Sequence, residues 1–339
     1  MARKPKAPTS VRRFLAEAGK KGGRARKVAL SDEQRSEIAR NAARVRWKVD
    51  GAVLEAKIIE EPLDNLLVAT ANRLEREWPA SLPGESAVCL RGLLLVSRNT
   101  FRTIRYFCAD RPLDTARKLE YSLTAIPLGR LILEAVFNTA FLLEDLPART
   151  NWYMKAGWAD MNEDYERLKR SYGKDGSWKD YLDSFAVVVE KGQKLLRLTP
   201  DEVAKPKTIS WWPRHSKMCG LASPDLSAYL EYLGDWFYKE MSEDAHLRWN
   251  GLVRLAGPLL QPEGDPEARE QLLKRQRSNA IATSAILQLA LVSEIALVPE
   301  IARTLELEVS KLRYLWAILN EHFLAGKEVY ERRYEERLP

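Results

Sequence analysis

Apolar residues recur at intervals of three and four along most of the chain, which is the spacing of one face of an α-helix. The pattern predicts a series of helices, over residues 63–74, 88–107, 113–143, 152–172, 178–196, 225–255, 266–298 and 300–337. Alternating β-branched runs are almost absent, with one weak example at 186–189. The proline-rich, aromatic stretch 205–224 is predicted as the one long loop. The sequence therefore predicts an all-α, multi-helix bundle.

The first 50 residues differ from the rest and predict a separate N-terminal arm. Residues 1–10 are basic and contain proline, so they are expected to be disordered. A short helix over 11–20, a glycine turn and a capped helix over 31–48 are expected to follow. We therefore expect a small helix-turn-helix-like arm over 1–50 and a helical body over 51–339.

Positive charge is concentrated in this arm. Residues 1–48 hold 15 Lys and Arg against four acids, whereas residues 49–339 hold 39 Lys and Arg against 43 acids. Such a segment is attracted to nucleic acid, because cations that neutralise phosphates release condensed counterions. Glycine lets the backbone approach a phosphate closely, and arginine grips it through two hydrogen bonds. The residues expected to bind nucleic acid are Lys20, Lys21, Arg24, Arg26, Lys27, Arg35, Arg40, Arg44 and Arg46.

Two alternatives for the arm are a solubilising segment without a dedicated ligand and a contact with an anionic membrane surface. The second is the weaker, because the arm has no continuous apolar face beyond Phe14 and Leu15.

Residues 19–47 follow the pattern G-x-x-G-G-x-A-R and then I-A-x-x-A-A-x-x-R-W. This pattern resembles a short basic segment found in many bacterial and phage-associated proteins.

Cysteine usage and hydropathy narrow the class of protein. Cys89, Cys108 and Cys219 lie far apart without a C-x-x-C pair, which argues against a disulfide framework and a zinc site and favours reduced thiols in the cytoplasm. No apolar run follows the basic N-terminus, so a secretory signal is not expected. The long apolar segment 280–298 contains Gln288 and Glu294, which are costly in lipid, so we expect a core helix and no membrane span.

A row of polar residues lies on the predicted helix over 113–143, in a part of it that is otherwise apolar. Arg130, Glu134 and Asn138 are spaced by four and therefore share one face of this helix. Buried charges need partners, so a side chain on another helix is expected to face the row, and His246, with Ser242 one turn before it, is the candidate. These residues could form a catalytic site, with His246 as acid or base and Arg130 as the phosphate ligand. Glu134 would orient one of them, and Ser242 would bind the substrate. The alternative is a buried network that fixes helix packing.

Three features of residues 85–300 appear in a recurring order. An R-x-x-x-E pair at Arg130 is followed by a W-x-P-type loop at Trp212 and an aromatic helix with S-x-x-x-H ending at His246. In these features the body resembles a bacterial family of helical domains of unknown function that is related to the HEPN fold. The resemblance implies a HEPN-like bundle and a homodimer, and active HEPN proteins are mostly metal-independent ribonucleases of defence and toxin systems. Their hallmark, an arginine five to seven residues before a histidine on one helix, is absent from this sequence.

These observations lead to one expectation about function and two alternatives. We expect a nucleic-acid-associated helical protein of defence or mobile-element character, which binds through the arm. The alternatives are a metal-independent ribonuclease that uses Arg130 and His246, and a non-enzymatic protein-interaction scaffold. No metal site is expected, because His215, His246 and His322 have no metal-ligand spacing, and no cofactor is expected.

Overall fold

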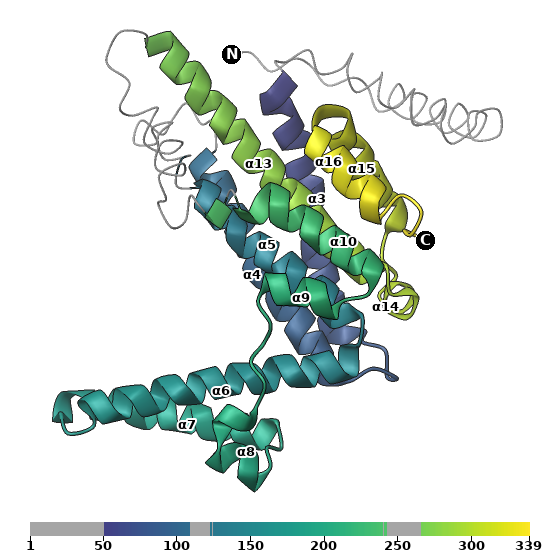
Figure 1. Ribbon diagram of the computed structural model, residues 1–339. Coiled ribbons are helices and arrows are strands. Elements are labelled where there is room, and N and C mark those ends of the chain that lie inside the picture. The colour runs from purple at the N-terminus through teal and green to yellow at the C-terminus, as the bar shows by residue number, and fades with distance from the viewer. Residues whose placement is uncertain (1–50, 109–122, 124, 240, 243–265) are drawn as a thin grey trace, which may run out of the picture. The chain divides into compact units, whose positions relative to one another are not determined.

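The computed structural model describes residues 51–108, 123, 125–239, 241–242 and 266–339. By the density of internal contacts the chain divides into two units, Met1–Leu54 and Glu55–Pro339, and the second unit is treated by itself below. All regular elements within the described residues are helices, and these residues contain no strand (Figure 1). The prediction of an all-α, multi-helix bundle is therefore confirmed.

The described helices follow one another through short connections. Their bounds are α3 Gly51–Arg76, α4 Gly84–Cys108, α5 Ala125–Leu143, α6 Leu146–Tyr172, η2 Gly176–Trp178, α7 Lys179–Leu195, α8 Pro200–Ala204, η3 Pro206–Thr208, α9 His215–Leu221, α10 Pro224–Leu233, η4 Gly234–Tyr238, α13 Pro266–Ala296, α14 Pro299–Thr304, α15 Val309–His322 and α16 Leu324–Arg333. Of the short elements, η2 and η3 are 3₁₀-helices, whereas η4 is a π-helix.

Helices α4, α5 and α13 pack against one another and form the centre of the body. Helix α5 buries Ile132, Val136 and Phe137 among other apolar side chains, and every residue of α13 from 284 to 296 is buried. Helices with apolar residues on nearly all sides are stable only in such an interior position. Helices α15 and α16 pack on α13, and α10 contacts both α5 and α16.

Charged pairs fix the register between α3 and α4. Arg105 donates to Glu60 at 2.6 Å, and Arg91 donates to Glu75 at 2.9 Å. Between them, Arg98 donates through both Nε and Nη2 to the two carboxylate oxygens of Asp64, at 2.9 and 3.0 Å. The partners run in opposite directions along the chain, so the two helices are antiparallel.

Buried polar residues of α13 make hydrogen bonds in the interior, although Gln288 Nε2 has no partner among the described residues. Ser97 donates to Gln288 Oε1 at 3.0 Å, and Trp316 Nε1 donates to Ser293 Oγ at 2.9 Å. By length and composition alone, residues Ala125–Leu143 and Arg277–Ala296 would each suffice to span a membrane, and 56% and 83% of their most apolar windows are buried inside the protein. Buried core helices pass the same test, so this is weak evidence for a span.

The expected long loop at 205–224 is wrong. It contains the 3₁₀-helix η3 and the helix α9, and only residues 205, 209–214 and 222–223 lie outside helices within it. Helix α9 buries Met218 and Cys219 against the main core. Seven residues are too few for a helical period to be read from the sequence, which is why the helix was not predicted.

Two predicted helices differ from the structure in their continuity. The predicted helix over 225–255 changes to a π-helix after Leu233, and its residues from 243 onward lie outside the described part. The predicted helix over 300–337 is three helices, α14 to α16, separated at 305–308 and at Phe323. Glu306 has a φ of 44°, which is incompatible with a continuous right-handed helix.

Helices α6 and α7 pair side by side (Figure 1) and share a small apolar cluster of their own. Trp158 of α6 and Val189 of α7 are buried in this cluster together with Ile209. The Cα of Gly192 faces Trp158 so closely that a Cβ there would lie 2.9 Å from the indole ring. The weak strand signal at 186–189 therefore belongs to the helix α7, where Val189 faces inward.

Candidate functional site

The predicted polar row lies on one face of α5 and is half-buried. Arg130 Nε donates to Glu134 Oε1 at 2.9 Å, and Arg130 Nη2 donates to the hydroxyl of Tyr238 at 3.0 Å. The Arg130 guanidinium also lies 5.0 Å from the centre of the Tyr238 ring. At the other end of the row, Asn138 Oδ1 accepts a hydrogen bond from Trp212 Nε1 at 2.8 Å. Other elements therefore do face the row, namely the π-helix η4 and the segment before α9.

The predicted partners of the row are only partly within the described chain. His246 lies outside the described residues. Ser242 is described and half-buried, and no hydrogen bond joins it to Arg130 or Glu134 among those residues. Tyr238, which sequence reasoning missed, is the observed partner of Arg130. Tyr238 stands four residues before Ser242 and eight before His246, so the same helical spacing did contain a signal for it.

His215 is the histidine that the structure places beside the row. Its ring lies against Phe137 of α5, with centroids 4.3 Å apart, and stacks on Tyr238 at 5.4 Å. Its Nε2 lies 2.8 Å from the carbonyl oxygen of Leu230, an acceptor, so Nε2 carries a proton. A Cβ on Gly234 would lie 2.2 Å from His215 Cε1, so only glycine fits there. The close approach of Gly234 and the bond to Leu230 hold the imidazole against the π-helix.

The nucleic-acid contacts predicted in the arm cannot be placed. Lys20, Lys21, Arg24, Arg26, Lys27, Arg35, Arg40, Arg44 and Arg46 all lie outside the described residues. Their assignment continues to depend on the sequence alone.

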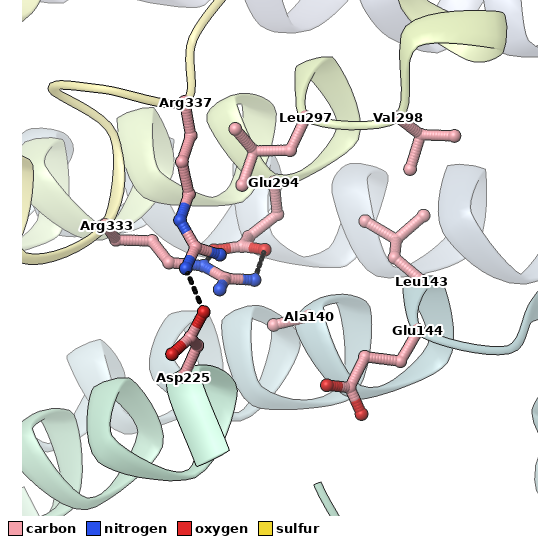
Figure 2. Close-up of a pocket in the computed structure, with 9 residues that line it drawn as sticks. All are labelled: Ala140, Leu143, Glu144, Asp225, Glu294, Leu297, Val298, Arg333 and Arg337. Atoms are coloured by element: carbon pink, nitrogen blue, oxygen red, sulfur yellow. Dashed lines mark hydrogen bonds and ion pairs between the residues drawn. The ribbon is translucent and has the colours of Figure 1, made fainter. Parts of the chain in front are cut away.

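A cavity of about 460 Å³ lies where α5, α10, α13 and the C-terminal segment meet. Figure 2 shows two ion pairs on one side of it and the aliphatic side chains of Leu143, Leu297 and Val298 on the other. Arg333 donates through Nε and Nη2 to the two oxygens of Glu294, both at 3.0 Å. Nearer the surface, Arg337 donates to Asp225 at 2.6 Å.

The innermost ion pair is part of a buried network. The exposed fraction of Glu294 is 1% and that of Arg333 is 8%. The hydroxyl of Tyr334 donates to Glu294 Oε1 at 2.9 Å and lies 2.7 Å from the hydroxyl of Tyr229. Burial raises the pKa of Tyr334 well above its usual range, and the charge of Glu294 raises it further. Burial acts to lower the pKa of Arg333, but Glu294 outweighs it and raises that pKa.

Glu144, on the opposite side of the cavity, is engaged by the start of α10. Both the backbone N–H of Ser223, at 3.0 Å, and its hydroxyl donate to Glu144, and Arg149 donates to it at 2.8 Å. Burial acts to raise the pKa of Glu144, but these hydrogen bonds hold it below its ordinary value. The charged groups around the cavity therefore neutralise one another, an arrangement typical of a packing network.

The described residues offer little for metal or thiol chemistry. No group of three or more His, Cys, Asp or Glu among them is close enough to hold a metal ion. Burial raises the pKa of Cys89 to about 11 and that of Cys108 to about 12, so neither thiol is a thiolate near neutral pH. Cys219 lies 3.7 Å from His215 Nε2, and burial raises its pKa as well.

Comparison of the chain with models of protein families, with curated proteins and with solved structures finds no match.

Proposed function

We propose that this protein binds nucleic acid through its N-terminal arm and is a nucleic-acid-associated protein of defence or mobile-element character. The observation that carries the proposal is the segregation of charge: 15 Lys and Arg against four acids in residues 1–48, beside a body with more acids than bases. Electrostatic attraction to phosphates supplies most of the affinity of non-specific nucleic-acid binding.

The charges of the body support the assignment of nucleic-acid binding to the arm. Between α3 and α4, three arginines are paired with three acids, and Glu294 is paired with Arg333 in the interior. Cations that already have a carboxylate partner gain less from a phosphate, because the new contact replaces an existing one. The arm holds nearly four cations for each acid and has no such compensation within its own sequence.

For the polar row on α5 we propose a packing role, in preference to a ribonuclease site. Arg130 donates hydrogen bonds to Glu134 and Tyr238. Asn138 accepts one from Trp212. Arg130 and Asn138 therefore link α5 to the elements that cover it. A phosphate-binding arginine would instead be expected to present its free donors to solvent. The HEPN-like character of the body stays a proposal that depends on the sequence resemblance.

The test is nucleic-acid binding by the full chain with cations of the arm neutralised. Arg24, Arg26 and Lys27 are replaced together by Gln, and binding of a labelled duplex is followed by fluorescence anisotropy across a salt series. Loss of three phosphate contacts should weaken binding and flatten the slope of log K against log salt by roughly 2 to 3.

The matched control replaces three exposed cations of the α6–α7 pair, Arg170, Lys174 and Lys191, by Gln. This variant has the same change of net charge, so it should retain both the affinity and the salt slope of the wild type. If both triple variants lose the same affinity relative to the wild type, net charge alone accounts for the binding and the arm has no dedicated role.

A further inference from the structure

A ten-residue segment, Lys205–Arg214, connects α8 to α9 and is called the strap below. It is anchored to α5 and α6 through one backbone carbonyl and through the side chain of Trp212. Trp152 Nε1 donates to the carbonyl oxygen of Ser210 at 2.8 Å, and Trp212 Nε1 donates to Asn138. The ring of Trp212 lies in an aromatic cluster formed by Phe141, Trp152 and Tyr153.

The strap presents one large aromatic side chain to solvent. Ile209 and Pro213 are buried, and Trp212 is half-buried, but the exposed fraction of Trp211 is 60%. Within the described part of the chain, the Trp211 indole makes no hydrogen bond and no contact with another ring. An exposed tryptophan on an anchored backbone contributes little to packing, and it is typical of a binding surface.

The strap is also a positive segment of a body that is otherwise mildly acidic. No acid occurs between Glu202 and Asp225, and four exposed cations, Lys205, Lys207, Arg214 and Lys217, lie in that interval. None of the four has an ion pair with a described residue. Glu202, at the edge of the interval, is already paired with Lys155 at 2.5 Å.

We propose that the strap is a second nucleic-acid contact, at which a base of a single strand stacks on Trp211 while the neighbouring cations hold its phosphates. The proposal deepens the proposed function, since it assigns the body a preference for single strands that the arm does not supply. Stacking requires an unpaired base, whereas phosphate contacts do not distinguish single strands from duplexes. A rigid platform also loses little conformational entropy when a base binds.

The test compares the full-length wild type with Trp211→Ala and Trp211→Phe, with Trp236→Ala as the matched control. Trp236 is also exposed, by 56%, but belongs to η4. The probes are labelled oligo(dT) of about 20 nucleotides, longer than most single-strand binding sites, and a mixed-sequence duplex of equal length. Anisotropy is measured in a salt series.

Trp211→Ala should weaken binding of oligo(dT) by about tenfold, as expected for loss of one stacked base, and leave the salt slope and duplex binding unchanged. Trp211→Phe should restore most of the affinity, and Trp236→Ala should bind like the wild type. Lys207→Gln with Arg214→Gln should instead reduce the salt slope by about 1.4, for two phosphate contacts with a single strand.

The outcomes separate this proposal from the proposed function. Equal binding of oligo(dT) by the Trp211→Ala and Trp236→Ala variants would overturn the strap proposal and leave the proposal for the arm unaffected. If neutralising Arg24, Arg26 and Lys27 has no effect while Trp211→Ala weakens binding, the arm proposal fails and the strap stands. Absence of any binding by the wild type would overturn both. Binding to vesicles of anionic lipid that depends on Trp211, without binding to oligo(dT), would make the strap a membrane contact and overturn the proposal.

Discussion

Burial makes the Glu294 and Arg333 pair the most sensitive charged contact that the described residues contain. Removing one partner of a buried ion pair leaves the other charge without compensation, which costs about 3–5 kcal/mol. Glu294→Gln should therefore lower the free energy of unfolding in urea by about that amount. Glu190→Gln breaks an exposed pair with Lys194, whose side chains are 62% and 73% exposed, and should leave the stability nearly unchanged.

A second variant keeps this test informative if Glu294→Gln does not fold. Replacing both partners, as Glu294→Leu with Arg333→Met, removes the uncompensated charge and should recover much of the lost stability. A loss below about 1 kcal/mol for Glu294→Gln alone would mean that the network is far more hydrated than its burial indicates.

The polar row on α5 allows a direct comparison of packing with catalysis. Arg130→Leu leaves the hydroxyl of Tyr238 and the carboxylate of Glu134 without their donor, and should cost about 1–3 kcal/mol of stability. The same loss is expected for His246→Ala from the sequence argument. Thermal unfolding and RNA cleavage without added metal are measured side by side. Unchanged melting temperatures, together with a wild-type cleavage activity that both variants lack, would make the protein a ribonuclease.

Sequence reasoning found some of these residues and missed others for physical reasons. Arg130, Glu134 and Asn138 were found because polar side chains at a spacing of four stand out in an apolar helix. His215 was missed because it begins a helix of seven residues, which is too short to leave a periodic signal. Tyr238 lies four residues before Ser242, so the spacing alone could have indicated it. The network around Glu294 was predicted only as a need for partners, since its members come from segments far apart in the chain.

At the scale of elements, the π-helix η4 is the feature that organises the site. It follows α10 without a break, and it brings Tyr238 over Arg130 while Gly234 faces the ring of His215. Such single π turns are rare and frequently occur at functional sites. Long helices such as α5 and α13 could be predicted from periodicity, but this register shift could not, because a single π turn leaves no periodic pattern in the sequence.

Gly234→Ala tests whether that packing matters. The new Cβ would lie 2.2 Å from His215 Cε1, so the ring must move, and we expect a loss of about 1–3 kcal/mol in urea unfolding. In a His215→Ala background the same substitution should cost much less, and the double-mutant cycle gives the coupling. Gly220→Ala is the matched control, because no atom lies within 4 Å of its Cβ position. Equal costs of Gly234→Ala in both backgrounds would show that the packing of His215 against η4 is not the reason for the cost.

At the scale of the whole molecule, we expect the helical body to fold without the basic arm. Among the residues whose burial the structure describes, the main apolar core begins at Ile59 and is built from helices of the body. Deleting residues 1–48 should therefore leave cooperative unfolding intact and shift the melting temperature by no more than about 3 °C, the equivalent of roughly 1 kcal/mol. Loss of the cooperative transition would show that the arm is integral to the fold.

The central claim is that the arm, and not the acidic body, supplies the main attraction to nucleic acid. The most direct measurement is duplex binding by the full chain and by residues 49–339 across one salt series. We predict that the truncated protein binds at least about a hundredfold more weakly at low salt, with a much smaller salt slope, because the phosphate contacts of the arm are gone and only those of the strap remain. Undiminished duplex binding by residues 49–339, with an unchanged salt slope, would contradict the account.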